Sequence, residues 1–170
     1  YEPLEVGADL IAGSLIKNPG GTLAVSGGYI AGREDLVDLC AEILTAPSLG
    51  NKIGSMFGLT RQLMHGLFLA PHVVGEAVTG AILAAEVFSS LGYDVSPLPH
   101  APRTDIVQAI RFTSRDELLK FCHGIQRAAP IDAHYLPVPS LMPGYVDEVV
   151  MAGGTFIQGS SIELSADAPL

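Results

Sequence analysis

The sequence predicts a mixed α/β fold, with the end of a larger α/β domain over residues 1–66 and a small α+β domain over residues 67–170. Short apolar stretches bounded by glycine and proline alternate with helical patterns along the chain. From the longest helical stretch onward, the predicted order is helix, strand, helix and three strands, which is typical of an α+β domain. Hydrophobic residues make up 48% of the chain, which is ample material for a core.

Composition limits the classes of function. The net charge is -9 with only 9 Lys and Arg, so there is no basic cluster to neutralise phosphates, which argues against nucleic-acid binding. Charged residues make up only 16%, which leaves little polar surface and favours burial against partner subunits or further chain. The chain lacks an initiator Met and stops straight after a strand-like stretch, so we interpret it as an internal segment of a longer protein.

The first region predicts two strands, a helix and a loop. Residues 8–16 predict a short buried strand ending at Ser14, and residues 22–30 predict a second strand with a bulge or close backbone approach at its paired glycines. Acidic residues open a helix near residue 34, where they suit the helix dipole, and its apolar positions continue to residue 44. Residues 48–60 are rich in glycine and small polar residues and predict a loop with one short helix.

The longest helical pattern spans about 70–91, and Gly92 supplies its stop signal. The apolar stretch over 67–91 is interrupted by His72, Glu76 and Glu86, so it predicts a buried helix rather than a membrane span. No secretory signal opens the chain, and we expect a cytoplasmic location without membrane attachment.

The last region predicts one further helix among short strands. Residues 94–99 are extended, 106–112 alternate as a strand, and Ser114 with Glu117 forms a capping box for a helix reaching about residue 128. The remaining strands are predicted, between proline and glycine turns, at 132–138, 145–152 and 155–165.

Cysteine and histidine give no metal site. Cys40 and Cys122 fall inside helical patterns and are interpreted as small buried thiols, because a disulfide framework or zinc site needs more cysteines at closer spacing. His72 and Glu76 lie four apart on one helical face, and two ligands without a third favour a hydrogen-bonded pair over a metal ion.

Lys17 is the strongest candidate for chemistry. It follows an apolar strand and precedes a proline–glycine turn, a setting that fixes the stem of the side chain and is expected to leave the amine facing a cleft. A desolvated lysine loses its proton readily, and only the neutral amine attacks a carbonyl. Lys52 and Lys120, the other two lysines, have no such setting.

Ser14 and Lys17 also form a Ser-x-x-Lys pattern, as in serine acyl-transferases of the penicillin-binding type. That class also requires Lys-Thr-Gly and Ser-Asp-Asn, and neither string occurs in the chain. No Gly-x-Gly-x-x-Gly after a strand and no Gly-Lys-Ser/Thr loop argues for a nucleotide.

Longer strings carry a family resemblance. They are Gly13 to Gly21, Gly27 to Gly32, Gly66 to Glu76 and Gly154 to Ser165. Together they resemble the methionine gamma-lyase-like family, also called aluminium resistance proteins, and Ser14-Leu-Ile-Lys17 resembles the internal-aldimine motif of fold-type-I pyridoxal-phosphate enzymes. The resemblance implies a segment of that fold, bound pyridoxal 5'-phosphate, and a homo-oligomer (dimer or tetramer) with active sites between subunits.

The resemblance also implies roles for residues. Lys17 would be the Schiff-base lysine and then a general base, and Ser14 would bind the cofactor phosphate. The family branch often has a second hydroxyl just before the lysine, where this chain has Ile16. The late strand that commonly supplies an arginine for the substrate carboxylate carries Glu163 here, which leaves Arg61 and Arg103 as candidates. Glu163 is interpreted as a structural hydrogen-bonding residue, with recognition of a substrate cation as the alternative.

The implied function is a carbon–sulfur lyase that acts by elimination on a sulfur-containing amino acid. A transaminase or decarboxylase using the same cofactor stays open, as does a family member that has lost activity and acts as a binding or scaffold protein. The segment alone is expected to be inactive, because the groups that contact the pyridinium nitrogen and stack on the ring lie outside these 170 residues.

Overall fold

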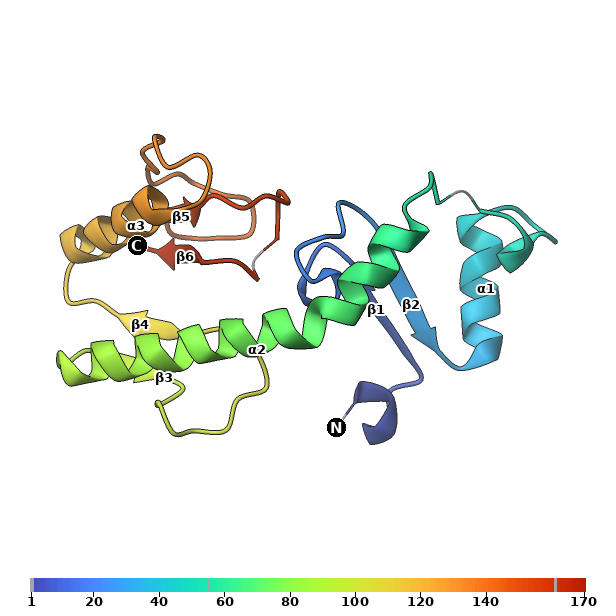
Figure 1. Ribbon diagram of the computed structural model, residues 1–170, viewed down its shortest axis with the longest axis horizontal. Coiled ribbons are helices and arrows are strands. Elements are labelled where there is room, and N and C mark those ends of the chain that lie inside the picture. The colour runs from blue at the N-terminus through green and yellow to red at the C-terminus, as the bar shows by residue number, and fades with distance from the viewer. Residues whose placement is uncertain (1, 55, 161) are drawn as a thin grey trace.

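The computed structural model describes residues 2–54, 56–160 and 162–170. One long helix, α2 (Thr60–Ser90), runs along the length of the molecule, as Figure 1 shows. The strands β1 (Leu10–Ser14) and β2 (Gly28–Gly32) lie toward its N-terminal end, whereas β3 (Asp94–Ser96) and β4 (Ala109–Arg111) lie toward its C-terminal end. We call residues 2–54 and 56–59 the N-terminal lobe, and residues 94–160 and 162–170 the C-terminal lobe.

The N-terminal lobe is built on an antiparallel hairpin. Strand β1 (Leu10–Ser14) pairs with β2 (Gly28–Gly32), from Leu10 opposite Gly32 to Ser14 opposite Gly28. The first strand ends at Ser14, which confirms that boundary. The second was predicted over 22–30, and only 28–30 of that range lies in the strand, because residues 21–23 form a turn after the short 3-10 helix η2 (Asn18–Gly20) and Gly27 adopts a φ of 110° immediately before the strand.

Helix α1 (Glu34–Leu44) follows β2 and confirms the predicted helix, with Glu34 and Asp35 in its first turn. Two further 3-10 turns complete the lobe, η1 (Pro3–Val6) and η3 (Gly50–Lys52), the latter inside the predicted loop.

Helix α2 begins at Thr60, ten residues before the predicted start. The helix continues through Pro71, although a proline in a helix interior removes a main-chain hydrogen bond. The expected burial is also wrong within this chain, since only 11% of its most apolar window is buried. By length and composition this helix could cross a membrane, which is weak evidence for a span.

The C-terminal end of α2 is closed by a glycine motif, as predicted from Gly92. The Tyr93 amide donates to the Phe88 carbonyl and the Gly92 amide to the Ser89 carbonyl, both at 3.0 Å, with Gly92 at a φ of 89°. Strand β3 (Asp94–Ser96) then pairs with β4 (Ala109–Arg111) in an antiparallel hairpin. Rings from α2, from the residues flanking this hairpin and from α3 (Arg115–Ala128) pack edge-on or tilted, with centroids between 5.0 and 5.9 Å: Phe88, Tyr93, Phe112 and Phe121.

Helix α3 (Arg115–Ala128) confirms the last predicted helix. The Ser114 hydroxyl accepts the Glu117 amide at 3.3 Å, but the Glu117 carboxylate receives the amide and hydroxyl of Thr113 instead of returning to the cap residue. The helix packs on a hairpin of β5 (Val149–Gly153) and β6 (Ser165–Pro169), with the core at Cys122, Val150 and Ala152.

The three strands predicted after α3 are largely wrong. Residues 132–138 form no strand, β5 overlaps the predicted 145–152 strand only from residue 149, and β6 begins where the predicted 155–165 strand was to end. The chain turns within or beside these stretches at Asp132, Gly144 and Gly159, which have positive φ values.

Candidate active site

Lys17 lies in the turn that leaves β1. It is the residue before η2, with an extended backbone, and its carbonyl accepts the Gly20 amide at 2.9 Å. The strand ends three residues earlier at Ser14, and the Leu15 amide donates to the Gly27 carbonyl at 2.9 Å across the start of the hairpin loop. The chain on both sides of Lys17 is therefore fixed by main-chain hydrogen bonds.

The turn after Lys17 is held against α2 by glycines. A Cβ built on Gly66 would lie 2.2 Å from the Gly20 carbonyl oxygen, and one on Gly21 would lie 2.3 Å from the Gly66 oxygen. Gly21 also has a φ of 52°, which favours glycine. One turn earlier on the helix, the Gln62 side-chain amide donates to the Leu23 carbonyl at 2.6 Å. The two backbones can approach this closely only because side chains are missing at the contact.

The amine of Lys17 reaches a segment far away in the sequence. Lys17 Nζ donates a hydrogen bond to the carbonyl oxygen of Gly159, and the neighbouring Ile16 side chain lies 3.3 Å from where a Cβ on Gly159 would stand. Lys17 itself is exposed in this chain. The described residues that contact Lys17 therefore do not form the predicted cleft, and they do not remove the amine from water.

The region that contacts Lys17 is a bent loop, residues 154–160 and 162–164, which we call the acceptor loop. The loop begins at Gly154, whose backbone approaches the Ile131 carbonyl so closely that a Cβ on Gly154 would lie 1.9 Å from that oxygen. The Ser160 amide donates to the Ile157 carbonyl at 3.0 Å, and the Phe156 amide lies 3.4 Å from Glu163 Oε2. Sequence reasoning placed a strand here and missed the contact, although Gln158-Gly159-Ser160 is a sequence typical of a turn.

Two polar atoms of the acceptor loop are buried without a donor in the described part of the chain. They are the hydroxyl oxygen of Ser160, whose residue is 5% exposed, and Oε1 of Glu163. Glu163 thus makes a structural hydrogen bond of the kind predicted for it through Oε2, whereas its Oε1 has no partner among the described residues.

Ser14 lies at the end of β1, half-buried, and its hydroxyl oxygen accepts the Ile16 amide at 3.3 Å. This bond uses the oxygen as an acceptor, so the hydroxyl proton can be donated to another group. The side chain is thus placed on the same turn as Lys17, with Ile16 between them.

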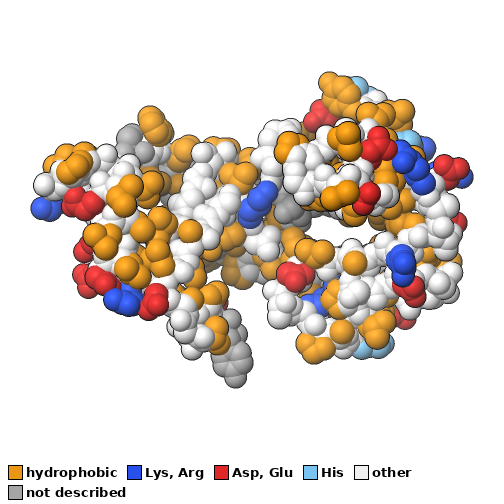
Figure 2. Space-filling view, turned by 180° about the vertical axis from the view of Figure 1, so that it is seen from behind, with side chains coloured by type: hydrophobic (Ala, Val, Ile, Leu, Met, Phe, Trp, Pro, Cys, Tyr) orange, Lys and Arg blue, Asp and Glu red, His pale blue; other side chains and the backbone are white. Residues whose placement is uncertain are grey.

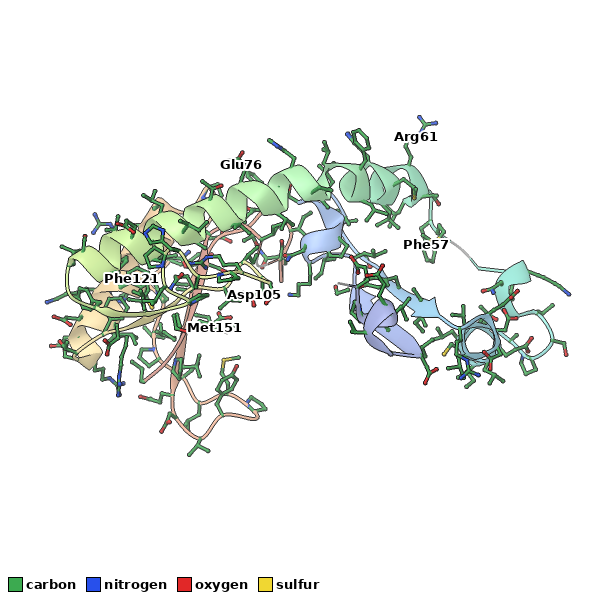
Figure 3. The ribbon with its side chains drawn as sticks, turned by 90° about the horizontal axis from the view of Figure 1, so that it is seen from below. Phe57, Arg61, Glu76, Asp105, Phe121 and Met151 are labelled. Carbon is green, nitrogen blue, oxygen red and sulfur yellow. The ribbon has the colours of Figure 1, made fainter. Side chains whose placement is uncertain are left out.

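The two candidate arginines lie in different parts of the molecule. Arg61 is exposed in the first turn of α2 and points away from the rest of the chain in Figure 3. Arg103 lies between β3 and β4 and donates to Val107 O at 3.4 Å and Gln108 Oε1 at 2.5 Å, while its Nε is buried without an acceptor among the described residues. No hydrogen bond or ion pair between described residues joins either arginine to Lys17, and their substrate role stays a prediction.

His72 and Glu76 are both exposed on α2. Within the residues that the structure describes, no group of three or more His, Cys, Asp or Glu is arranged to hold a metal ion.

The family model described as methionine gamma-lyase matches residues 1–170. Among curated proteins, Bacillus subtilis YnbB, itself uncharacterized, is 48% identical over 169 residues, which is 99% of this chain and 40% of YnbB. An uncharacterized 33.9 kDa protein of Lactobacillus delbrueckii is 46% identical over 170 residues, covering 56% of its length. The chain thus spans about two fifths to just over half of these relatives.

Solved structures match over nearly the whole chain. A Listeria monocytogenes protein named as a candidate cystathionine beta-lyase involved in aluminium resistance is 52% identical, with a TM-score of 0.93, and the match covers 99% of this chain and 42% of that one. A Clostridium novyi protein named as a carbon–sulfur lyase involved in aluminium resistance is 50% identical, with a TM-score of 0.91, over 99% of this chain and 39% of its own.

Proposed function

This chain belongs to the methionine gamma-lyase family, and from that premise we propose that it is part of a pyridoxal-phosphate-dependent carbon–sulfur lyase acting by elimination on a sulfur-containing amino acid. The proposal includes the fold-type-I architecture, with residues 1–66 in the large domain and 67–170 in the small one, and assembly as a homo-oligomer. The observation that supports it is the placement of Lys17, whose turn packs closely on α2 while its amine contacts the Gly159 carbonyl in the acceptor loop.

The residues of the turn fit this cofactor. An aldehyde needs a primary amine, and Lys17 Nζ is exposed on a turn whose backbone is fixed on both sides. A phosphate needs hydrogen-bond donors, and the Ser14 hydroxyl has a proton to give from the same turn. Ile16 offers no second hydroxyl, so further donors must come from main-chain amides or from other parts of the protein. When bound, the cofactor would supply an electron sink for the substrate.

The other tasks of this site belong to the protein. We call the close backbone contact of Gly20 and Gly21 with Gly66 the clamp. It orients the side chain of Lys17, so the amine can return to the same position in each turnover. Once released, that amine is the group able to move a proton at the substrate carbon next to the amino group. An arginine for the substrate carboxylate is proposed from Arg61 or Arg103, in a setting completed by the rest of the protein.

The test uses the full natural chain. Borohydride treatment followed by peptide mass spectrometry is expected to fix the cofactor on Lys17, and elimination should release a 2-oxo acid and ammonia without a second keto acid. We expect Lys17→Ala to abolish the cofactor label and to lower turnover about 100- to 10,000-fold. Lys52→Ala, at an exposed position in η3, is the matched control and should change neither. A label on another lysine would refute the assignment, and a requirement for a keto acid would indicate a transaminase.

A further inference from the structure

Two side-chain oxygen atoms of the acceptor loop have no hydrogen-bond donor among the described residues. Ser160 Oγ and Glu163 Oε1 are both buried, and neither has a hydrogen-bond partner among the described residues. Buried polar atoms in folded proteins are nearly always paired, and an unpaired carboxylate oxygen is among the most costly exceptions. A bound group that donates hydrogen bonds would remove this cost.

The same loop already receives one such donor. The carbonyl oxygen of Gly159 accepts a hydrogen bond from Lys17 Nζ, and Ser160 is the next residue along the chain. A primary ammonium group has three N–H donors and no acceptor. A carbonyl, a hydroxyl and a carboxylate within five residues are the acceptors that such a group requires, and the carboxylate also supplies the opposite charge.

We propose that Gly159 O, Ser160 Oγ and the Glu163 carboxylate form a binding site for a primary ammonium group beside Lys17. The inference rests on the proposed function, since that reaction brings two such groups to this place: the ammonium of Lys17 itself and the ammonium of the incoming amino acid. The acceptor loop binds whichever of these two ammonium groups is not bonded to the cofactor. Ser160 and Glu163 are therefore positioning residues.

The experiment measures ammonium binding without turnover. The full natural chain, with cofactor removed, is titrated with methylammonium by calorimetry, and tetramethylammonium serves as a control cation that has the same charge but no N–H donor. Lys17→Ala is titrated in parallel. If the site serves Lys17, the variant should bind methylammonium at least about tenfold more tightly than the unsubstituted protein. If the site serves the substrate, the two proteins should bind it equally well. Either result supports the site.

Substitutions in the loop test the named oxygens. In the Lys17→Ala background, Glu163→Gln keeps the shape but removes the charge, and we expect about tenfold weaker methylammonium binding. Ser160→Ala gives a second, smaller reduction of about threefold, and it keeps the test decisive if the Glu163 variant fails to fold. Glu148→Gln is the matched control, because its carboxylate is paired with Arg115 at 2.6 Å, and it should leave binding unchanged.

The inference is overturned if methylammonium binds no better than tetramethylammonium in both proteins, or if the folded Glu163 and Ser160 variants bind it as tightly as their parent. Such a result would leave the proposed function standing, provided that borohydride still fixes the cofactor on Lys17. If borohydride fixes no cofactor on Lys17 but methylammonium still binds, the proposed function is refuted and the ammonium site remains.

Discussion

The two lobes at the ends of α2 are stabilised in different ways. The C-terminal lobe has a core in which Cys122 and Val150 are fully buried, and four aromatic rings join it to the end of α2. In the described N-terminal lobe, the buried hydrophobic side chains are Ala24 and Ala41, while Ile43 is 85% exposed. This lobe is instead attached through backbone contacts at glycines. One lobe can be stabilised by its own side chains, whereas the other depends on surfaces beyond it.

The total surface supports this contrast. The chain exposes 11470 Å², against roughly 8,000 Å² for a compact monomer of its 17.8 kDa mass. Figure 2 shows apolar side chains spread over both lobes on one face. In the proposed assembly, further chain or partner subunits would cover this apolar area, which is also what the low charge content predicts.

The largest expected effect comes from separating the lobes. A fragment of residues 60–170 should unfold cooperatively on heating, because it keeps the α3–β5–β6 core and the aromatic cluster. A fragment of residues 1–59 should show no cooperative transition, since it lacks a core of large side chains. Circular dichroism against temperature measures both. A cooperative melt of the shorter fragment would contradict the contrast.

Gly66→Ala should damage the contact that holds the Lys17 turn. The new Cβ would lie 2.2 Å from the Gly20 carbonyl oxygen, so the backbone must shift, and we expect a loss of about 1–3 kcal/mol in the free energy of unfolding. Gly80→Ala on the same helix meets nothing within 4 Å and should stabilise by up to about 1 kcal/mol. Urea denaturation of the full natural chain compares them, and equal effects at the two positions would argue against the clamp.

Truncating a large hydrophobic side chain should lower the free energy of unfolding in the C-terminal lobe but not in the N-terminal lobe. Val150→Ala removes two methyl groups from a fully buried position, and we expect a loss of about 2–3 kcal/mol. Ile43→Ala, at an exposed position of α1, should change stability by less than about 0.5 kcal/mol in residues 1–170 alone. A clearly larger Ile43 effect in the full natural chain would show that other parts of the protein cover α1.

The smallest expected effect concerns the thiols. Burial raises the pKa of Cys122, with a smaller contribution from the charge of Asp167, so the native state retains its proton at pH values where the unfolded thiol, with a pKa of about 8.5, loses it. This contribution to stability is complete below that pH and is lost as pH rises toward the native pKa. Stability should therefore fall slightly above about pH 8.5. Cys122→Ala should remove that component, and Cys40→Ala, at a half-buried site on α1, should not.

Local sequence signals located the helices better than the strands. Acidic first turns, Ser114 and Gly92 mark helix ends through interactions within a few residues, and those ends were found. The start of α2 was predicted ten residues too late, because nothing nearby in the sequence reveals that the helix extends upstream to where Gly66 packs against η2. Strands after α3 were misplaced, since alternation is equally compatible with a bent loop.

For the candidate site, the sequence by itself determined which chemical groups Lys17 and Ser14 offer and the family that their surroundings resemble. Residue types and spacing are enough for that, because they specify the groups available for reaction. Only the tertiary structure decided that Gly66 packs against the turn after Lys17 and that the Gly159 carbonyl accepts a hydrogen bond from the Lys17 amine. The residues of each contact are more than forty positions apart in the sequence. No local pattern predicts such long-range contacts, because they depend on how the backbones pack.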